Sequence, residues 1–581
     1  MKFSFTKKSN RTRHISFLLA VLLAVSLLAN HFIPSSTDIN KTFEKFTLSL
    51  FQQEVSANTI NLHYTLQNPA EYGVLNTPVT YGGFSTDKVS AMASVENCES
   101  ILKKFPYRKL SKENRLTYDV LESYLQLQKE GCNYLLYEEP LNAVTGIQAQ
   151  LPVLLAEYSF TKKEDIDTYL QLLEATPDYF DALIDFEKEK AEKGLFLSDE
   201  VADSIIEQCE SVVSQGKRHY LYSTFQNRLE TISSLSQEER KQYLLENEKM
   251  IQNYVFPSYE KLIRELKSMR GKGEKMTGVC HFPDGKKYYQ YIAKRETGSS
   301  RKISELKSLI QKQMTEDLLA ISQTGVSMEA SATVFSLQDN TPESYLKDLE
   351  KKITKVFPAA PEVDTEIKFV PTDMESYLSP AFYLIPCIDN TEKNVIYINR
   401  SHDMEKLHLY TTLAHEGYPG HLYQTTYFAS QNPNPIRSLL NFGGYVEGWA
   451  TYAEMCSYYL APLEKKQAVL AQKNNSLLLG LYARADIGIH YDGWSLQDTV
   501  KFFSKYGIRE EETIAEIYEL IVSTPANYLK YYVGYVEFLE LKKEVAGRKG
   551  EDFSQKQFHK EILDIGPAPF SVVRKYVLQG K

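Results

Sequence analysis

The chain has 581 residues, of which 43% are hydrophobic, so it can bury a large core, and its length favours two or more domains. The formal charge of −9 provides no basic field, and lysine and arginine form no stripe in the body of the chain, which argues against nucleic-acid binding. The 40 tyrosines far outnumber the two tryptophans, so most individual tyrosines are expected to be packing residues.

Residues 1–34 predict an export signal. Five basic residues precede an apolar run at 15–29, and a polar stretch follows it, which is typical of a secretory signal peptide or signal anchor. The run is short for a spanning helix, its small-x-small cleavage candidate at 24–26 lies inside it, and no cysteine follows it to form a lipobox. We expect the bulk of the chain to be exported, either secreted or anchored by this segment, with no other membrane contact.

The cysteines give no strong signal. Their number permits disulfides in an exported protein, but their wide spacing selects no pairing and matches no zinc–thiolate site. Buried free thiols, or one or two bridges, are the simplest expectation for Cys98, Cys132, Cys209, Cys280, Cys387 and Cys456.

Residues 39 to about 270 have the period of amphipathic helices, clearest at 166–193 and 237–267. A turn at 278–285 then leads into a tyrosine-rich segment that is either extended or helical. His281 lies in this turn and is expected to be structural rather than to line a cleft.

Helices are expected again at 303–322 and 342–356. This pattern gives a helical N-terminal lobe over residues 35–350 and a second lobe, which carries the chemical motifs, over residues 351–581.

Three short runs in the second lobe, at 366–370, 381–387 and 395–399, have the composition of β-strands. The last run lies directly upstream of the strongest motif. It is expected to be either an edge strand that pairs with an extended substrate or an ordinary core strand.

The stretch at 411–424 carries the strongest chemical signal in the chain. His415, Glu416 and His421 place two imidazoles and a carboxylate within seven residues. Neutral imidazole is a common zinc ligand, and a glutamate beside a zinc ion can take a proton from the attacking water. The stretch predicts a zinc site with its own general base, Glu416.

The spacing of the two histidines requires a break in the helix. Zinc-peptidase motifs place their histidines four residues apart on one helix face, whereas His415 and His421 are six apart and would lie about 240° around a straight helix. Pro419 interrupts the helical hydrogen bonds, and Gly420 tolerates unusual dihedral angles. We predict a kink that returns His421 to the face of His415.

A catalytic zinc site needs three protein ligands and an open position, and the third ligand is often a glutamate on a later helix. Glu447 and Glu454 are seven residues apart and share a helix face, so either can reach the metal while the other orients a ligand. We prefer Glu447 as the ligand and Glu454 as its support. His408 lies two turns, or about 10 Å, before His415 along the helix axis and is treated as structural.

Amide hydrolysis also needs hydrogen-bond donors for the developing oxyanion. The candidates in the C-terminal third are His490, Tyr528, Tyr531 and Tyr532. Arg484 is a candidate for binding a substrate carboxylate, which would favour carboxypeptidase action, or for pairing with Asp486.

Taken together, the motifs resemble the domain of unknown function 885 (DUF885) family, placed among the thermolysin-like (gluzincin) zinc peptidases. The resemblance rests on residues 415–421, 445–450, 486–494, 525–534 and 558–569, with a weaker match at the turn 280–285. It implies a mainly α-helical, two-lobed fold around a deep cleft, with a small β-sheet near the zinc helices.

The resemblance also implies roles for individual residues. His415 and His421 match the family's ligands, Glu416 its base and Glu447 its third ligand, and Tyr531 is favoured as the oxyanion donor. The chain departs from the family pattern at Leu422, where the family has a second histidine, and at 525–527, where Pro-Ala-Asn replaces Pro-Gly-Gln. These departures bear on substrate preference and, at Leu422, on metal affinity.

The sequence therefore predicts an exported zinc metallopeptidase that hydrolyses oligopeptides in or near the cell envelope. Two alternatives remain open. One is a zinc amidase that cuts a non-peptide or cell-wall amide, and the other is a non-catalytic exported protein that binds peptides.

Overall fold

The computed structural model describes residues 38–579, apart from 145, 274–276, 326–334, 336, 371, 373–374, 376–377 and 403. Helices dominate this part of the chain, and its strands form one small sheet, which confirms the mainly α-helical prediction. The export segment predicted at 1–34 lies outside the described residues. Within them, no helix is both long enough and apolar enough to cross a bilayer.

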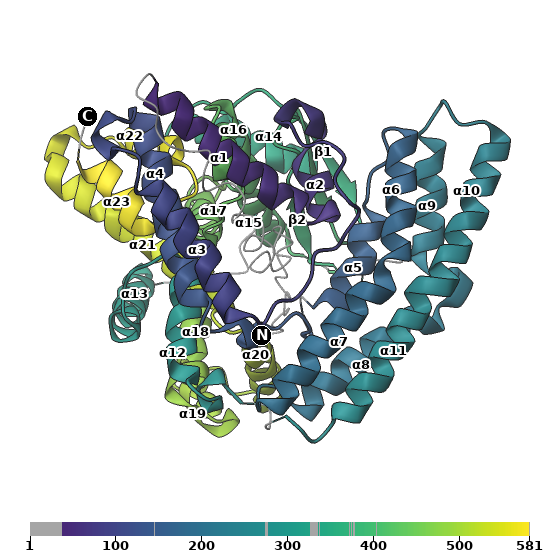
Figure 1. The fold of residues 1–581 in the computed structure, drawn as a ribbon. Helices are drawn as coiled ribbons and strands as arrows, with labels where there is room; N and C mark the ends of the chain where they lie inside the picture. Colours follow the sequence, from purple (N-terminus) through teal and green to yellow (C-terminus); the bar gives the residue numbers. More distant parts are fainter. Residues whose placement is uncertain are drawn as a thin grey trace.

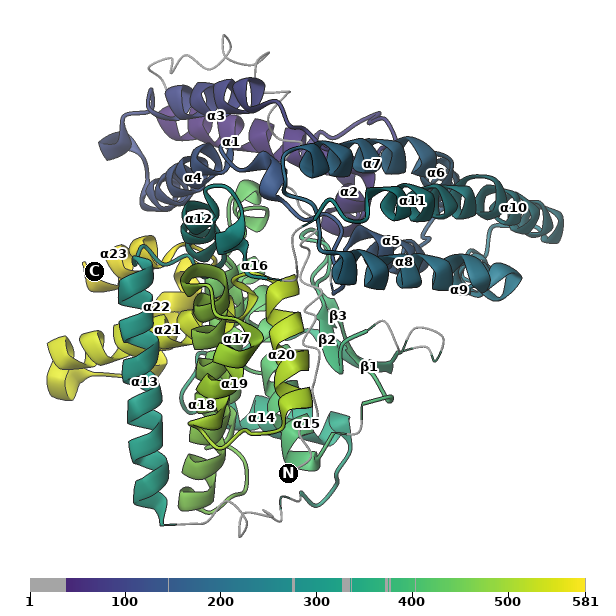
Figure 2. The same ribbon diagram turned by 90° about the horizontal axis from the view of Figure 1, so that it is seen from below.

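Apolar side chains gather into two cores, which divide the molecule into a body and an arm. The body is built from residues 43–135 together with residues 279–577, and the arm from residues 141–269 with a few side chains from elsewhere. Figures 1 and 2 both show the arm as a group of helices that projects from the body. The predicted boundary near residue 350 is therefore not where the cores divide.

The body begins with four helices that pack onto the C-terminal end of the chain. They are α1 (Ile39–Ser56), α2 (Thr59–Thr65), α3 (Lys88–Leu102) and α4 (Lys112–Gly131). On α4, the carboxylate of Asp119 accepts hydrogen bonds from Lys575 Nζ at 2.7 Å and from the Tyr576 hydroxyl at 2.8 Å. α4 thus packs against α23 (Phe570–Leu578) at the opposite end of the sequence, a contact that sequence periodicity cannot show.

The remaining body helices follow the arm in sequence. They are α12 (Gly285–Thr297), α13 (Ile303–Thr324), α14 (Pro342–Ile353), α15 (Lys406–Glu416), α16 (His421–Ser430), α17 (Gly443–Ser457), α18 (Lys465–Ile487), α19 (Leu496–Ser504), α20 (Glu511–Ser523), α21 (Asn527–Lys549), α22 (Gln555–Ile565) and α23 (Phe570–Leu578). The tyrosine-rich segment is thus helical, as part of α12.

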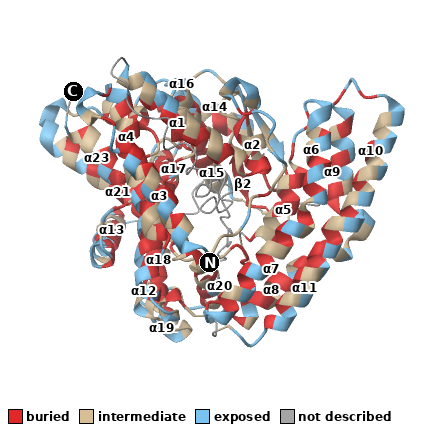
Figure 3. Ribbon diagram, viewed as in Figure 1, coloured by how far each residue is buried: buried red, intermediate tan, exposed pale blue. Residues whose placement is uncertain are grey.

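The arm consists of α5 (Ile147–Ala156), α6 (Lys163–Glu174), α7 (Thr176–Glu192), α8 (Asp199–Ser214), α9 (Tyr220–Glu230), α10 (Gln237–Met250) and α11 (Phe256–Met269). The predicted helix at 166–193 is split, because Pro177 starts a new helix in the first turn of α7, where its missing N–H costs nothing. The helix predicted at 237–267 runs through α10 and α11, joined by a π-helical turn at Ile251–Val255. Figure 3 shows buried residues on the inward faces of these helices and exposed residues outside.

The sheet contains three strands, β1 (Asp364–Phe369), β2 (Ala381–Leu384) and β3 (Lys393–Ile398), in the order β1-β3-β2. β3 pairs in parallel with β1 and antiparallel with β2. The edge-strand expectation for 395–399 is therefore wrong, because β3 is hydrogen-bonded on both sides and Ile396 is fully buried. The edge strand beside α15 is β2, and Figures 1 and 2 show the sheet between α15 and the arm.

At the centre of the body, α17 packs closely along α21. A Cβ on Gly448 of α17 would lie 2.4 Å from the backbone carbon of Gly534 of α21, so neither helix tolerates a side chain at this crossing. This close approach fixes the position of α17, which carries Glu447 and Glu454. The six cysteines are free thiols, three of them buried and three partly exposed, so of the two expectations the structure has free thiols and no bridge among them.

Candidate metal centre

The motif at 411–424 forms two helices rather than one kinked helix. α15 ends at Glu416 and α16 begins at His421. Between them, Gly417 (φ −109°, ψ −106°) and Gly420 (φ −83°, ψ −130°) leave the helical region, and the Tyr418–Pro419 peptide bond is cis. The predicted kink is thus a complete break of four residues.

Tight packing holds this break in place. A Cβ on Gly420 would lie only 1.8 Å from the carbonyl oxygen of His415, so the chain can return past α15 only with glycine at this position. From α17, the indole Nε1–H of Trp449 donates a 2.8 Å hydrogen bond to the carbonyl of Pro419. The break between α15 and α16 is therefore tied to α17, the helix that carries Glu447.

The break brings the predicted ligands together. One ligand atom from each of His415, His421 and Glu447 can be chosen so that all three lie within 4.8 Å of one another. The Glu447 carboxylate oxygen Oε2 lies 3.4 Å from Nε2 of His421 and 3.7 Å from Nε2 of His415. The two imidazole rings are nearly perpendicular, with centroids 4.9 Å apart, and both Nε2 atoms face the same Glu447 oxygen.

Glu454 supports the cluster, as preferred from the sequence. The Nδ1–H of His415 donates to Oε2 of Glu454 at 3.0 Å, which leaves Nε2 as the atom directed at the cluster. Asn475 of α18 in turn donates from Nδ2 to Oε1 of Glu454 at 2.9 Å. Sequence reasoning missed Asn475, because no motif connects it to residues on α15 or α17.

The three residues fit a zinc ion. They are almost completely buried, with Glu447 fully enclosed, and two imidazoles with one carboxylate form the three-ligand set of catalytic zinc sites. The Nε2 atom of His421 is buried and makes no hydrogen bond within the described part of the chain. Burial alone would raise the pKa of the Glu447 carboxyl, but the electrostatic attraction of the nearby His421 and His415 imidazoles and of Lys530 holds it well below its usual value.

Glu416, the predicted base, is the last residue of α15 and directly follows His415. Its Oε2 atom accepts a 3.0 Å hydrogen bond from the backbone N–H of Tyr383 in β2. Because β2 is an edge strand, this N–H is available outside the sheet. The small sheet thus has a specific role, since its edge holds the Glu416 carboxylate in one orientation.

His490 does not have the geometry expected of an oxyanion donor. Its Nε2–H donates to the carbonyl of Ile521 at 2.8 Å, and its Nδ1 accepts from the backbone N–H of Val279 at 3.2 Å. The ring is fully buried, and burial lowers its pKa to about 4. With both ring nitrogens engaged by the backbone, His490 is a structural residue.

Arg484 has a different partner from the one considered. It pairs with Asp492 at 3.4 Å and lies over the ring of Trp494. Asp486 instead accepts hydrogen bonds from the hydroxyl of Tyr289 and the backbone N–H of Ala526, and burial raises its pKa to about 7.

The three remaining tyrosine candidates lie in the first turns of α21, the helix that packs along α17. Tyr532 is fully buried and packs against Tyr535, with ring centroids 6.2 Å apart. Tyr528 packs against Tyr482, with ring centroids 5.1 Å apart. Tyr531 is almost fully buried, and the ammonium of Lys530 lies 5.4 Å from its ring. Their roles as oxyanion donor or substrate contact stay predictions.

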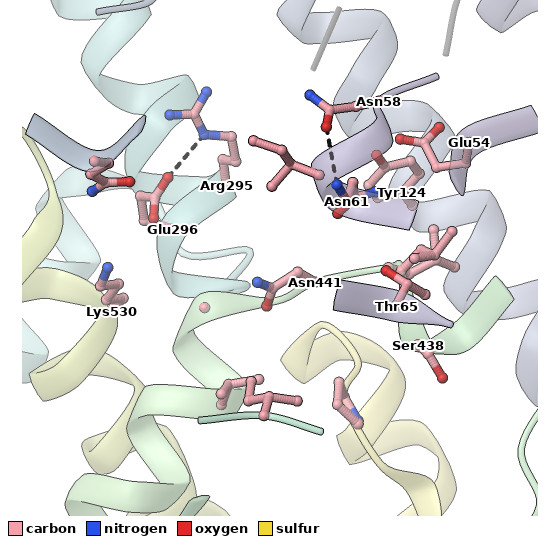
Figure 4. A pocket seen from close by; sticks show the side chains of 18 of the residues that line it. Glu54, Asn58, Asn61, Thr65, Tyr124, Arg295, Glu296, Ser438, Asn441 and Lys530 are labelled. Carbon is pink, nitrogen blue, oxygen red and sulfur yellow. Dashed lines mark hydrogen bonds and ion pairs between the residues drawn. The ribbon is translucent and has the colours of Figure 1, made fainter. Parts of the chain in front are cut away.

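A cavity of about 730 Å³ lies next to the candidate metal centre. Gln424 of α16, Val446 of α17 and Lys530 of α21 contribute to its wall, together with residues of α1, α2, α4 and α12 (Figure 4). The three candidate ligands do not line it, although Gln424 and Val446 of its wall lie on the same helices as His421 and Glu447. Sequence reasoning did not find this cavity, since its wall combines helices from distant parts of the chain.

Comparison with known proteins gives a family and a fold. The family of bacterial proteins of unknown function, DUF885, matches residues 86–577. A candidate lipoprotein of Colwellia psychrerythraea is 17% identical, with a TM-score of 0.81 over 94% of this chain and 99% of that one. A candidate lipoprotein of unknown function from Shewanella oneidensis is 16% identical, with a TM-score of 0.61 over 94% of this chain and 100% of that one. No curated protein matches the sequence.

Proposed function

The chain belongs to the DUF885 family, and we propose that it is a zinc-dependent peptidase that hydrolyses oligopeptides. One observation carries the proposal, which is the convergence of His415, His421 and Glu447 within 4.8 Å in a buried position beside Glu416. A purely structural cluster would not need two inward-facing imidazole nitrogens, a buried carboxylate and a second carboxylate behind one imidazole. The proposal includes a reaction mechanism like that of the gluzincin peptidases.

The proposed ligands are His415, His421 and Glu447, and zinc bound to them would supply a Lewis acid for the substrate carbonyl. Glu454 fixes the tautomer of His415 through its 3.0 Å hydrogen bond, so that Nε2 carries the lone pair toward the cluster.

Glu416 is the proposed general base. Its carboxylate takes a proton from the attacking water and gives it to the amine that leaves. Glu416 is therefore again an ionised carboxylate at the end of the reaction. The hydrogen bond from Tyr383 N–H limits the rotation of this carboxylate, which keeps it oriented for both transfers. Tyr531 is the proposed oxyanion donor, in keeping with its place in the motif at 525–534.

The test is a Glu416→Gln variant compared with a Glu405→Gln control. Glu405 precedes the same helix and is exposed, so its replacement leaves the site untouched. We expect zinc content to stay unchanged in both variants, whereas peptide turnover falls by roughly 100-fold or more in Glu416→Gln alone. Full turnover by zinc-loaded Glu416→Gln, or no turnover of a peptide library by the zinc-loaded wild type, would contradict the proposal.

We also propose that the protein acts outside the cytoplasm. The pattern at 1–34 supports export, and both structural relatives are described as candidate lipoproteins. Fractionation of cells expressing the full chain checks the location, and recovery in the cytoplasm would contradict it.

A further inference from the structure

The cavity next to the candidate metal centre has a basic residue at one side and an acidic residue at the other. Lys530 of α21 and Glu54 of α1 both line it, and Figure 4 shows them on opposite sides with Asn441 between them. The wall between them is partly apolar and includes Ile60, Leu151, Val446 and Phe428. A volume of about 730 Å³ falls in the range of small-molecule sites, so it admits a short peptide but not a folded protein.

Lys530 is a buried cation that forms no ion pair with any of the described residues. It is only 7% exposed, and among the described residues no carboxylate lies within ion-pair distance of its ammonium. The other two basic residues of the cavity are engaged, since Arg295 pairs with Glu138 and Glu296, and Arg437 donates to backbone carbonyls. A buried ammonium is costly unless an anion compensates it, and a ligand carboxylate would do so.

The position of Lys530 connects the cavity to the candidate metal centre. A Cβ on Gly443, the first residue of α17, would lie 3.5 Å from Lys530 Cδ, so the side chain packs over the start of the helix that carries Glu447. The Lys530 charge also acts on the Glu447 carboxylate itself. An anion held at Lys530 would therefore lie close to the proposed zinc ligands.

Glu54 is the matching acidic residue at the other side. It is 8% exposed and makes no side-chain hydrogen bond or ion pair within the described residues. The polar residues Asn58, Asn61, Thr65 and Tyr124 line the cavity around it. Burial raises the pKa of the Glu54 carboxyl to about 8, and an ammonium ligand would favour its ionised form.

We propose that this cavity binds a short peptide with both ends free, with the terminal carboxylate at Lys530 and the terminal ammonium at Glu54. The proposal rests on the proposed function and deepens it, because it names the substrate class as free-ended oligopeptides. The placement of the carboxylate beside α17 puts the C-terminal part of the peptide nearest the metal centre.

The experiment measures binding rather than turnover, by isothermal titration of the zinc-loaded full chain carrying Glu416→Gln. The probes are the tetrapeptide Ala-Ala-Phe-Ala, its C-terminal amide and its N-acetyl form. We expect each blocked end to weaken binding by about 10- to 100-fold, the range expected for loss of a charged hydrogen bond.

Added substitutions assign each end of the peptide. Lys530→Met should bind the acid and the amide equally, whereas Lys530→Arg should keep the preference for the acid, and the exposed Lys505→Met serves as control. Glu54→Gln should bind the free and acetylated peptides equally. Glu139, a second acidic residue of the cavity, is tested in the same way with Glu139→Gln, and loss of amine preference there instead would overturn the assignment to Glu54.

Equal affinity for free and blocked peptides, or no binding of any of the three, would overturn the proposal. A protein that binds free-ended peptides but never cleaves them contradicts only the proposed peptidase activity. A protein that cleaves peptides without regard to their ends contradicts only the assignment of the cavity.

Discussion

Replacing Gly420 with alanine should damage the candidate metal centre although residue 420 is not a ligand. The new Cβ would lie 1.8 Å from the carbonyl oxygen of His415 and 2.5 Å from that of Ala414, whereas real Cβ atoms essentially never approach within 3.0 Å. The chain at 415 and at 420 must therefore separate by roughly 1 Å. Metal–ligand distances tolerate only about 0.2 Å, so this movement separates His421 from His415 beyond what one ion can bridge.

The magnitude follows from the cost of overpacking, about 1–3 kcal/mol. If the clash destabilises the zinc-bound protein relative to the zinc-free protein by this amount, the zinc dissociation constant rises by roughly 10- to 100-fold. Competition with a chromophoric chelator measures this change, and thermal melts with and without zinc separate it from a general loss of stability.

Gly547→Ala is the matched control for this measurement. Gly547 lies in α21 with nothing within 4 Å of the position of a Cβ, so alanine there should leave zinc binding unchanged and stabilise the helix by up to about 1 kcal/mol. Wild-type zinc affinity in Gly420→Ala would refute the argument that this glycine permits the return of the chain past α15.

Three further predictions concern the support of the site and the buried acid of the cavity. Glu454→Gln should weaken zinc binding by about 10- to 100-fold in the chelator assay while Asn475→Ala has a smaller effect, and unchanged affinity in Glu454→Gln would show that the His415 contact does not matter. Zinc at 100 times its dissociation constant should stabilise the wild type by about 2.7 kcal/mol in denaturant titrations, and His421→Ala should gain none of this. Because folding raises the Glu54 pKa from 4.5 to about 8, the stability it contributes is fully present below pH 4.5 and is lost as pH rises through 8. The unfolding temperature of Glu54→Gln should therefore exceed that of the wild type at pH 9 but not at pH 4.5. An equal difference at both pH values would contradict a raised pKa of Glu54 in the folded protein.

The local part of the site was predictable because its signals are local. The six-residue spacing of His415 and His421 required a break at Pro419 and Gly420, and the seven-residue spacing of Glu447 and Glu454 placed both on one helix face. What the spacing could not give was the form of the break. The chain leaves the helix entirely for four residues, since the close approach to the His415 carbonyl admits no side chain.

The roles of His490 and Arg484 were harder to predict, because they depend on contacts made by residues far away in the sequence. His490 resembled a candidate donor until its ring nitrogens were found on the backbones of Val279 and Ile521. Arg484 was considered as a partner of Asp486, but it pairs with Asp492, because Asp486 is engaged by Tyr289 of α12 and by the backbone N–H of Ala526.

The division into lobes was also beyond sequence periodicity. Amphipathic helices of the body and the arm have the same period, and only the partner of each apolar face decides which core it joins. β3 was likewise ambiguous, because a short apolar strand fits a central or an edge position equally well until its neighbours are known.

The central claim is that His415, His421 and Glu447 bind zinc, and X-ray absorption combined with metal analysis of the purified full chain tests it most directly. We predict about one zinc per wild-type chain, with nitrogen and oxygen ligands near 2.0–2.1 Å and no sulfur, and almost none in His421→Ala. Sulfur ligation, equal zinc content in His421→Ala, or a wild-type chain that takes up no zinc would contradict the claim.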